Sequence, residues 1–422
     1  MDFINFLKEN IYVLMGIKTA IVVGVFMHVL AYLQWIERKV IAHVQLRVGP
    51  RRVGPHGLLQ PLADVIKLIT KEDMVPSHVN KVFYYLAPFV AVLFALISIS
   101  VIPFGPTIDI GGLRTNMSLA DPGIGVLFIL GISGMGVYGV ALAGWASNNK
   151  YSLMGGLRSS AQMISYELPM ALAIAAPLLI LNTLSLREIG EKQAGFALGF
   201  IPNWTIFTGG QIVSFFLFMV AAFAETNRVP FDLPEAENEL VAGFHTEYSS
   251  MKFASFFMAE YANMVTVSAV ATLLFLGGWH PILPTAWGSN FIPALIHIGG
   301  GLICFYHAAN PARPFDKYTL PVFGVIFCGI GAVFALAAAG PGVVEPLGIA
   351  PLTMLVSILS QVLPPLFWFC GKVLAILFVF IWVRATLPRF RYDQLMGFAW
   401  TFMFPAALVN LFVTGLVVAL LS

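Results

Sequence analysis

Long apolar segments dominate the sequence and limit what it can fold into. A helix that crosses the hydrocarbon core of a bilayer needs roughly 20 mainly apolar residues. Candidates for such spans are 11–35, 82–103, 123–145, 161–182, 209–226, 254–277, 366–384 and 397–421. A chain in lipid must satisfy its backbone hydrogen bonds internally, which helices do. The sequence therefore predicts an all-α polytopic membrane protein.

The composition excludes the other broad classes. Apolar residues make up 59% of the 422, and charged residues only 10%, against about 25% in an ordinary soluble domain. A water-soluble enzyme would need more polar surface, and a disordered chain has the opposite composition. The net charge of +2 is too small to indicate a nucleic-acid-binding protein.

Lysine and arginine are distributed unequally between the two sides of the predicted spans. With loop 36–81 in the cytoplasm, the basic residues of loop 225–253 and of the segment 384–391 lie there too. The opposite side then carries only Lys8, Arg114, Arg187 and Lys192. Because cytoplasmic loops are enriched in these residues, we expect this orientation, with the N-terminus outside.

The region 278–365 contains three further apolar stretches, 291–308, 319–340 and 348–363. The arginines that follow span 366–384 return to the cytoplasm only if an even number of these stretches cross the membrane. Arg313 and Lys317 lie between the first two, so we expect that pair to cross. Segment 348–363 is then expected on the outer surface or as a re-entrant piece. The total is about ten spans, in a bundle of residues 1–277, an inserted region 278–365 and a C-terminal pair 366–422.

Residues 56–71 read as an amphipathic helix rather than a span. Leu58, Leu62, Val65 and Ile69 fall on one helical stripe, and the charged residues fall on another. This pattern is typical of a helix that lies at the membrane interface. A helix packed on the cytoplasmic mouth of the bundle is the alternative, and the two are compatible.

Carboxylates within apolar segments are the candidates for function, because ionisable groups are costly in hydrocarbon. Glu167 and Glu260 lie inside predicted spans, and Glu37 and Glu225 lie at the ends of spans. Pro169 leaves the carbonyl of Ser165 without its helical donor, which offers a place for water beside Glu167. The alternative for Glu167 and Glu260 is a satisfied structural hydrogen bond. The alternative for Glu37 and Glu225 is an interfacial position at the end of a span.

Loop 225–253 is rich in acids. It holds Asp232, Glu235, Glu237, Glu239 and Glu247 after Glu225. On a helix, Glu235 and Glu239 share a face, and repulsion between them would raise the pKa of at least one. Together with the acids in the spans, they form a chain that a proton path requires. A solvated acidic loop is the alternative.

The basic segments RVGPRRVGP (47–55) and RATLPRFRYDQ (384–394) have several explanations. They set topology, contact lipid phosphate, pair with the acidic loop or bind a soluble partner, and composition does not decide among these.

No redox or metal site is indicated in the chain. Cys304, Cys328 and Cys370 lie alone in apolar segments, which predicts inert thiols rather than a disulfide or an iron–sulfur site. His297 and His307 lie near opposite ends of one short segment, which argues against haem ligation. Any redox cofactor is therefore expected in another subunit.

Four strings carry a resemblance to a known family. They are ERKVIAHVQLRVGPRRVGPHGLLQPLADVIK (37–67), GWASNNKYSLMGGLRSSAQMISYELP (144–169), AETNRVPFDLPEAENELVAGFHTEYSSMKFASFFMAEY (224–261) and WVRATLPRFRYDQLM (382–396). The chain resembles the quinone-site membrane subunit, the H subunit, of bacterial NADH:quinone oxidoreductase, which is respiratory complex I.

The resemblance implies a multi-pass subunit of the bacterial inner membrane at the heel of an L-shaped, proton-translocating electron-transport complex. Its first and sixth spans and the interfacial helix would frame a portal through which quinone, such as ubiquinone, reaches a chamber. Soluble quinone-site and iron–sulfur subunits would hold FMN and the iron–sulfur clusters, and antiporter-like membrane subunits would pump protons. NAD chemistry would likewise belong to the soluble partners.

The resemblance also assigns roles to residues. The acidic path matches Glu37, Asp64, Glu167, Glu225, Glu235, Glu237, Glu239 and Glu260, and the chamber and its loops match Arg38, Arg47, Arg228 and Asp232. Two departures stand out. The family usually has eight spans, so region 278–365 adds two. The third span, 123–145, has no carboxylate, so proton transfer should rely on the fourth and sixth spans.

Two other functions compete with this hypothesis. A stand-alone proton-coupled transporter would also use mid-membrane glutamates, although no internal repeat is visible. A passive membrane anchor for a related hydrogenase, or for a dehydrogenase with another electron donor, is the other alternative.

Overall fold

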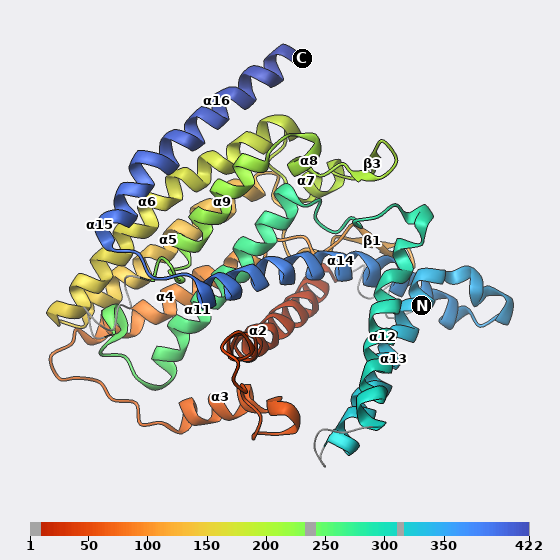
Figure 1. The fold of residues 1–422 in the computed structure, drawn as a ribbon, viewed down its shortest axis with the longest axis horizontal. Helices are drawn as coiled ribbons and strands as arrows, with labels where there is room; N and C mark the ends of the chain where they lie inside the picture. The colour runs from red at the N-terminus through yellow and green to blue at the C-terminus, as the bar shows by residue number, and fades with distance from the viewer. Residues whose placement is uncertain (1–9, 233–241, 310–315, 422) are drawn as a thin grey trace.

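The computed structural model describes residues 10–232, 242–309 and 316–421, and helices make up most of them (Figure 1). Nine helical segments in these ranges are long and apolar enough to cross a membrane. They are α2 (Ile11–Val44), α4 (Lys81–Ile99), α5 (Gly125–Ala146), α6 (Lys150–Leu181), α11 (Ser250–Phe275), α12 (Ile292–Ala309), α13 (Asp316–Ala339), α14 (Ala350–Thr386) and α16 (Phe404–Leu421). The shorter apolar helix α9 (Ile212–Glu225) is a tenth candidate. The predicted all-α polytopic membrane protein is confirmed.

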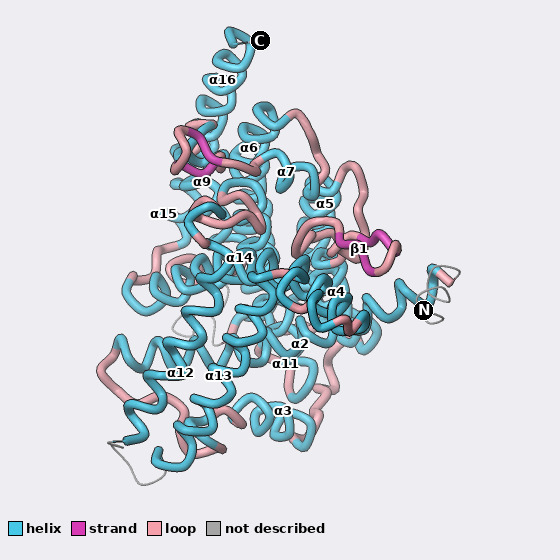
Figure 2. Tube along the Cα trace, turned by 90° about the vertical axis from the view of Figure 1, so that its right-hand side faces the viewer, coloured by secondary structure: helices cyan, strands magenta, loops and turns pink. Residues whose placement is uncertain are grey.

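The remaining elements are short. They are α3 (Gln60–Thr70), α7 (Leu186–Lys192), α8 (Thr205–Thr208), α15 (Tyr392–Gly397) and two small antiparallel hairpins, β1 (Ile108–Ile110) with β2 (Leu113–Thr115) and β3 (Phe196–Ala197) with β4 (Ile201–Pro202). Figure 2 shows them as connections between long helices. A π-helical turn at Phe398–Met403 joins α15 to α16.

Contacts between loops show that the helix ends lie on two faces of the bundle. We call one of them the α3 face. On it, Asn149 Nδ2 donates to Glu247 Oε1 at 2.7 Å, and Arg389 pairs with Asp232 at 2.9 Å. On the opposite face, Arg187 pairs with Asp121 at 2.7 Å. The basic loops of the predicted cytoplasmic side therefore lie together on the α3 face.

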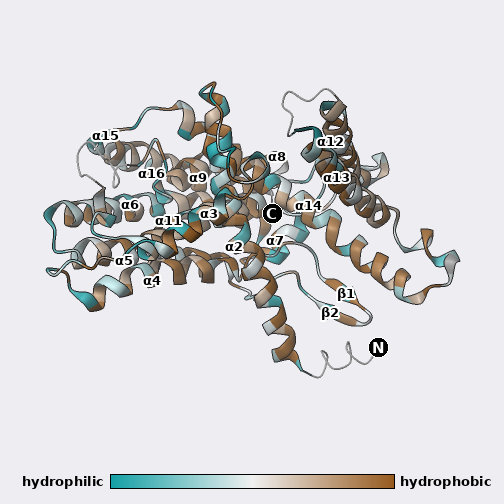
Figure 3. Ribbon diagram, turned by 90° about the horizontal axis from the view of Figure 1, so that it is seen from below, coloured by the Kyte–Doolittle hydropathy of each residue, from teal (hydrophilic) through white to brown (hydrophobic). Residues whose placement is uncertain are grey.

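The inserted helices α12 and α13 form an antiparallel hairpin beside α14 (Figure 1). The start of α13 lies on the α3 face, because Asp316 Oδ1 is 3.5 Å from His56 Nε2 and Thr319 is also 3.5 Å from that ring. Hydropathy is high along both helices (Figure 3). These two helices are the pair that the sequence predicted to cross.

Segment 348–363, expected on the outer surface or as a re-entrant piece, is not separated from the predicted span 366–384. These residues are the first part of α14, a continuous helix of 37 residues that is about 55 Å long and exceeds the hydrocarbon thickness. Gln361 Oε1 accepts from the backbone N–H of Asp109 at 2.9 Å, which places this part against the opposite-face hairpin. Pro364 and Pro365 lie inside the helix without ending it, so the two apolar stretches on either side of them form one helix.

Other helix boundaries differ from the apolar segments. Helix α2 extends to Val44 and α6 begins at Lys150, so polar residues at the ends of spans are helical too. The predicted span 209–226 begins later, since Gly210 takes a left-handed backbone with φ of +64° and separates α8 from α9. Hydropathy predicts which residues lie in the lipid, whereas the ends of a helix depend on its backbone hydrogen bonds. A helix can therefore extend beyond the apolar segment.

Helix α3 carries its apolar residues outward. Ser250 Oγ donates to the carbonyl of Leu68 at 2.7 Å and ties α3 to α11. Leu62, Val65 and Ile69 are nevertheless exposed. The helix is thus attached to the bundle by polar contacts and leaves an apolar stripe open, as the interfacial prediction requires.

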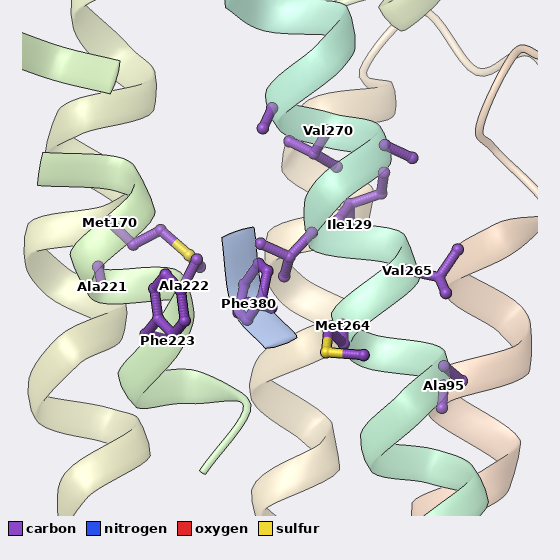
Figure 4. Close-up of a cluster of buried hydrophobic side chains, with 14 of the residues drawn as sticks. Ala95, Ile129, Met170, Ala221, Ala222, Phe223, Met264, Val265, Val270 and Phe380 are labelled. Carbon is purple, nitrogen blue, oxygen red and sulfur yellow. The ribbon is translucent and has the colours of Figure 1, made fainter. Parts of the chain in front are cut away.

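Helix α11 forms the centre of the fold. In its most apolar window 78% of the residues are buried, against 11% for α2. Met264, Val265 and Val270 of α11 pack among Ile129 of α5 and Phe380 of α14 (Figure 4). The polar residues Thr266, Ser268 and Thr272 of α11 are therefore held in a protein interior rather than against lipid.

Glycine permits the close approach of α5 and α6. A Cβ on Gly144 would lie 2.6 Å from the carbonyl oxygen of Ser152 and 3.0 Å from Cα of Gly156. Small residues at such crossings let membrane helices approach closely. The contact depends on backbone atoms, which cannot move aside as a flexible side chain would.

We expect Gly144→Ala to lower the thermal midpoint of the purified complex in mild detergent, at a cost of about 1–3 kcal/mol for overpacking. Gly131→Ala is the matched control on the same helix, because nothing lies within 4 Å of its Cβ position. Equal midpoints for the two variants would contradict the close packing of α5 on α6.

Candidate functional site

Glu37 is the centre of a buried ionic cluster near the end of α2. Its side chain is only 4% exposed. Arg228 Nη1 donates to Oε1 and Oε2 at 3.2 and 3.4 Å, and the hydroxyl of Tyr261 donates to Oε2 at 2.7 Å. Arg384 also donates to Oε1. The cluster joins α2, the loop after α9, α11 and α14 around one carboxylate.

Arg228 is the more deeply buried of the two arginines. Burial, the largest single effect, disfavours its charged form, but Glu37, Tyr261 and Glu260 together outweigh burial and raise the pKa of Arg228. The guanidinium also lies over the ring of Tyr261, 4.2 Å from its centroid, where the ring face attracts a cation. Glu260 acts on the same guanidinium electrostatically. Arg228 thus stands between two of the predicted acids.

Glu225, Glu260 and Glu167 come together in the interior. Glu225 is the last residue of α9, and it lines a cavity of about 30 Å³ together with Glu260 and Asn263 of α11. Glu167 of α6 interacts electrostatically with Glu225. Its carboxylate rests against α5, where a Cβ on Gly134 would be 2.6 Å from Oε1. Three acids that are distant in sequence therefore share one region.

The acid and base on the α3 face form a separate, more exposed group. Arg38 Nη1 donates to Asp64 Oδ2 at 2.7 Å, and Gln60 Nε2 donates to Oδ1 at 3.0 Å. Arg47 is exposed, and its Nε donates to Gln45 at 2.7 Å. The structure brings Arg38 and Asp64 together but leaves Arg47 apart. Glu235, Glu237 and Glu239 lie outside the described residues.

Asp232 fastens the loop after α9 to the chain that follows α14. Its Oδ2 accepts from Arg389 Nη2 at 2.9 Å. Further along, Gln162 Nε2 of α6 donates to the carbonyls of Ala224 and Phe231, each at 2.8 Å. These contacts hold the residues around Arg228 in place. Arg228 and Asp232 are thus anchored parts of the site rather than free loop residues.

Aromatic rings hold the second half of the acidic loop. His245 packs against Phe244, Phe253 and Phe257, with ring centroids 5.1 to 5.8 Å apart. Burial in these rings lowers the pKa of His245 to about 4, so the imidazole is neutral at ordinary pH. The sequence of this acidic loop would suggest that His245 titrates near neutral pH. Its aromatic environment instead keeps it neutral and packed among the rings.

Sequence reasoning missed three side chains that complete the interior. Arg384 was not matched to Glu37 among the explanations for segment 384–394, and Tyr261 was not singled out, yet both bind Glu37. Lys372 is buried in α14 and donates to the carbonyls of Leu276, Gly278 and His280 at 2.6 to 2.9 Å, which caps the end of α11. A lysine within the apolar run 366–384 was the available signal.

The described ranges contain no group of three or more histidine, cysteine, aspartate or glutamate side chains that could hold a metal ion. What the site offers instead is acid–base chemistry. Carboxylates and arginines run from the α3 face into the bundle, with small cavities between some of them.

Removal of Arg228 should destabilise the fold strongly, because it leaves the buried Glu37 with less compensation. We expect Arg228→Met to cost about 3–5 kcal/mol, measured as a lower thermal midpoint of the complex. The double variant Glu37→Gln with Arg228→Met should lose less, because no carboxylate then remains.

Arg38→Met is the control for that experiment. Its pair with Asp64 has side chains that are 44% and 23% exposed, and such pairs contribute about 0–1 kcal/mol. If Arg228→Met proved no more damaging than Arg38→Met, the Glu37 cluster would not stabilise the bundle.

Comparison with known proteins gives consistent matches along the whole chain. The sequence profile described as NADH dehydrogenase matches residues 17–415. NADH-quinone oxidoreductase H subunit 1 of Solibacter usitatus is 64% identical over 405 residues, 96% of each chain. The H subunit 2 of Koribacter versatilis is 47% identical over 414 residues, again 96% of each. The H subunit 2 of Geobacter metallireducens is 41% identical over 97% of this chain and 96% of its own.

Proposed function

The chain belongs to the NADH dehydrogenase family, as a membrane subunit of the enzyme complex NADH-quinone oxidoreductase, and from this premise we propose how it works. It frames the portal and chamber for quinone, and it links quinone reduction to proton translocation through a chain of carboxylates. The series Glu37, Arg228, Glu260, Glu225 and Glu167 supports this proposal most directly. The stand-alone transporter is set aside, since the named relatives are subunits of one oxidoreductase.

The proposed portal lies where α2, α3 and α11 approach one another. Asp64 and Arg38 connect α3 to the end of α2, and the apolar stripe of α3 offers a surface for an isoprenoid tail. The quinone headgroup would be reduced in a chamber shared with soluble quinone-site and iron–sulfur subunits. FMN and the clusters would belong to those partners, while quinone is the substrate.

Proton coupling follows from the charge balance of the buried acids. Quinone reduction takes up electrons together with protons, so an acid that supplies a proton to the reduced quinone is itself left with the negative charge. Arg228 interacts with both Glu37 and Glu260, so a change at Glu37 alters the field at Glu260. Glu225 shares a cavity with Glu260, and proton transfer through one water is within reach. Antiporter-like membrane partners would receive the signal.

We expect Glu167→Gln or Glu225→Gln to lower quinone-linked NADH oxidation about a hundredfold or more and to leave ferricyanide reduction by the soluble arm unchanged. A glutamine keeps the shape but cannot carry the proton. Glu345→Gln is the control, because Glu345 is exposed on the opposite face. Parental turnover in both interior variants would remove them from the path.

We further propose that the chain lies in the bacterial inner membrane with the α3 face in the cytoplasm and the N-terminus outside. The basic residues on the α3 face support this orientation. A cysteine at Tyr318, whose side chain is 72% exposed at the start of α13, should react with an impermeant maleimide only from the cytoplasm. A cysteine at Leu198, 83% exposed, should react only from outside.

Both substitutions are made in a background where Cys304, Cys328 and Cys370 are replaced. Labelling of intact spheroplasts is compared with labelling of inverted vesicles. The reverse pattern at the two positions would invert the proposed topology.

A further inference from the structure

Two buried polar atoms near the centre of the bundle have no hydrogen-bond partner among the described residues. They are Oε2 of Glu225 and Oγ1 of Thr266. The two residues are 6% and 3% exposed. Buried polar groups are nearly always hydrogen-bonded, to protein or to ordered water, so this pair requires an explanation.

Thr266 differs from the other hydroxyl residues in the same part of α11. Ser268 Oγ donates to the carbonyl of Met264 at 2.7 Å, and Thr272 Oγ1 donates to that of Ser268 at 2.9 Å. This bond to the preceding turn is the usual choice for a hydroxyl within a helix. Thr266 forms no such bond, so its hydroxyl keeps its donor for another group.

Glu225 and Thr266 line the same cavity, which we call the Thr266 cavity. Its volume is about 20 Å³, and Ser98, Ser133 and Asn263 also line it. One water molecule fits in such a volume and needs two to four polar partners. Glu225 and Asn263 in addition line the larger cavity with Glu260 described above. The Glu225 carboxylate therefore has room for water on two sides.

We propose that a water molecule in the Thr266 cavity bridges the Thr266 hydroxyl to Oε2 of Glu225. Thr266 is thus a positioning residue that acts through this water and stabilises the ionised form of Glu225. The inference deepens the proposed proton path and rests on it.

The bridge has a defined chemistry. The Thr266 hydroxyl donates to the water, and the water donates to the ionised carboxylate. When Glu260 passes a proton to Glu225 through water in the other cavity, that water accepts one proton and gives one up, so it is unchanged. Without the Thr266 bridge the ionised acceptor is less favourable and proton release from Glu225 is slower.

The titratable groups that face Glu225 are Glu167 from α6 and Glu260 from α11. The cavity-lining residues contributed by α4 and α5 are uncharged. The Ser133 hydroxyl, which lines the same cavity, also hydrogen-bonds to Glu225. The Thr266 water therefore adds to that bond in opposing the repulsion from the two acids.

The test compares Thr266→Val with Thr272→Val in the assembled complex. Both threonines are buried on α11, but the Thr272 hydroxyl is satisfied by its own helix. We expect Thr266→Val to lower quinone-linked turnover about tenfold, less than the loss of a direct proton donor, and to shift the pH–activity profile to higher pH. Thr266→Ser should restore both, and ferricyanide reduction should not change.

If Thr266→Val behaves like Thr272→Val, the bridge is overturned. If Glu225→Gln has no effect either, the proposed path fails with it, whereas a defect in Glu225→Gln alone leaves the path intact. A high-resolution density map of the parent complex tests the water directly, whether or not the variant assembles. Density within hydrogen-bonding distance of Glu225 and Thr266 is expected, and an empty cavity would overturn the inference.

Discussion

The fold depends on one buried carboxylate. Glu37 lies in an interior where an uncompensated charge would be very costly, so Arg228, Arg384 and Tyr261 must all be in place around it. Each comes from a different segment, and the carboxylate thereby fixes α2, the loop after α9, α11 and α14 relative to one another. An ionic cluster of this kind specifies an arrangement more than it adds net stability. It also makes the arrangement sensitive to any change of charge nearby.

Helix α11 connects the Glu37 cluster with the cavities in the interior of the bundle. Tyr261 contacts Glu37, whereas the adjacent Glu260, with Asn263 and Thr266, faces cavities toward α4, α5, α6 and α9. Neighbouring residues on a helix point about 100° apart, so one buried helix serves both the ionic cluster and the acids. Lys372 fixes the chain directly after α11 by donating to the carbonyls of Leu276 and Gly278.

The outer elements serve a different purpose. Helix α3 and the hairpin of α12 and α13 keep large apolar residues exposed. The hairpin packs on α14 through Phe334 and Phe367, and Asp316 joins it to His56 in the segment before α3. Apolar surface of this extent suits lipid or a neighbouring membrane protein. The chain therefore combines a closely packed interior that holds buried charges with an exposed apolar periphery, as suits one component of a larger membrane complex.

The sequence by itself determined the fold class, and it singled out Glu37 and Glu225, which the structure buries, because hydropathy and the cost of buried charge are local properties of the chain. It could not predict that 348–363 and 366–384 form one helix, α14. Two prolines between apolar stretches are compatible with a break between two segments as well as with one continuous helix. Only the tertiary structure decided that Arg384 and Tyr261 bind Glu37, that Arg47 stands apart, and that Thr266 and Glu225 line one cavity. Those outcomes depend on contacts between residues up to 347 positions apart, and no local pattern records which side chains meet.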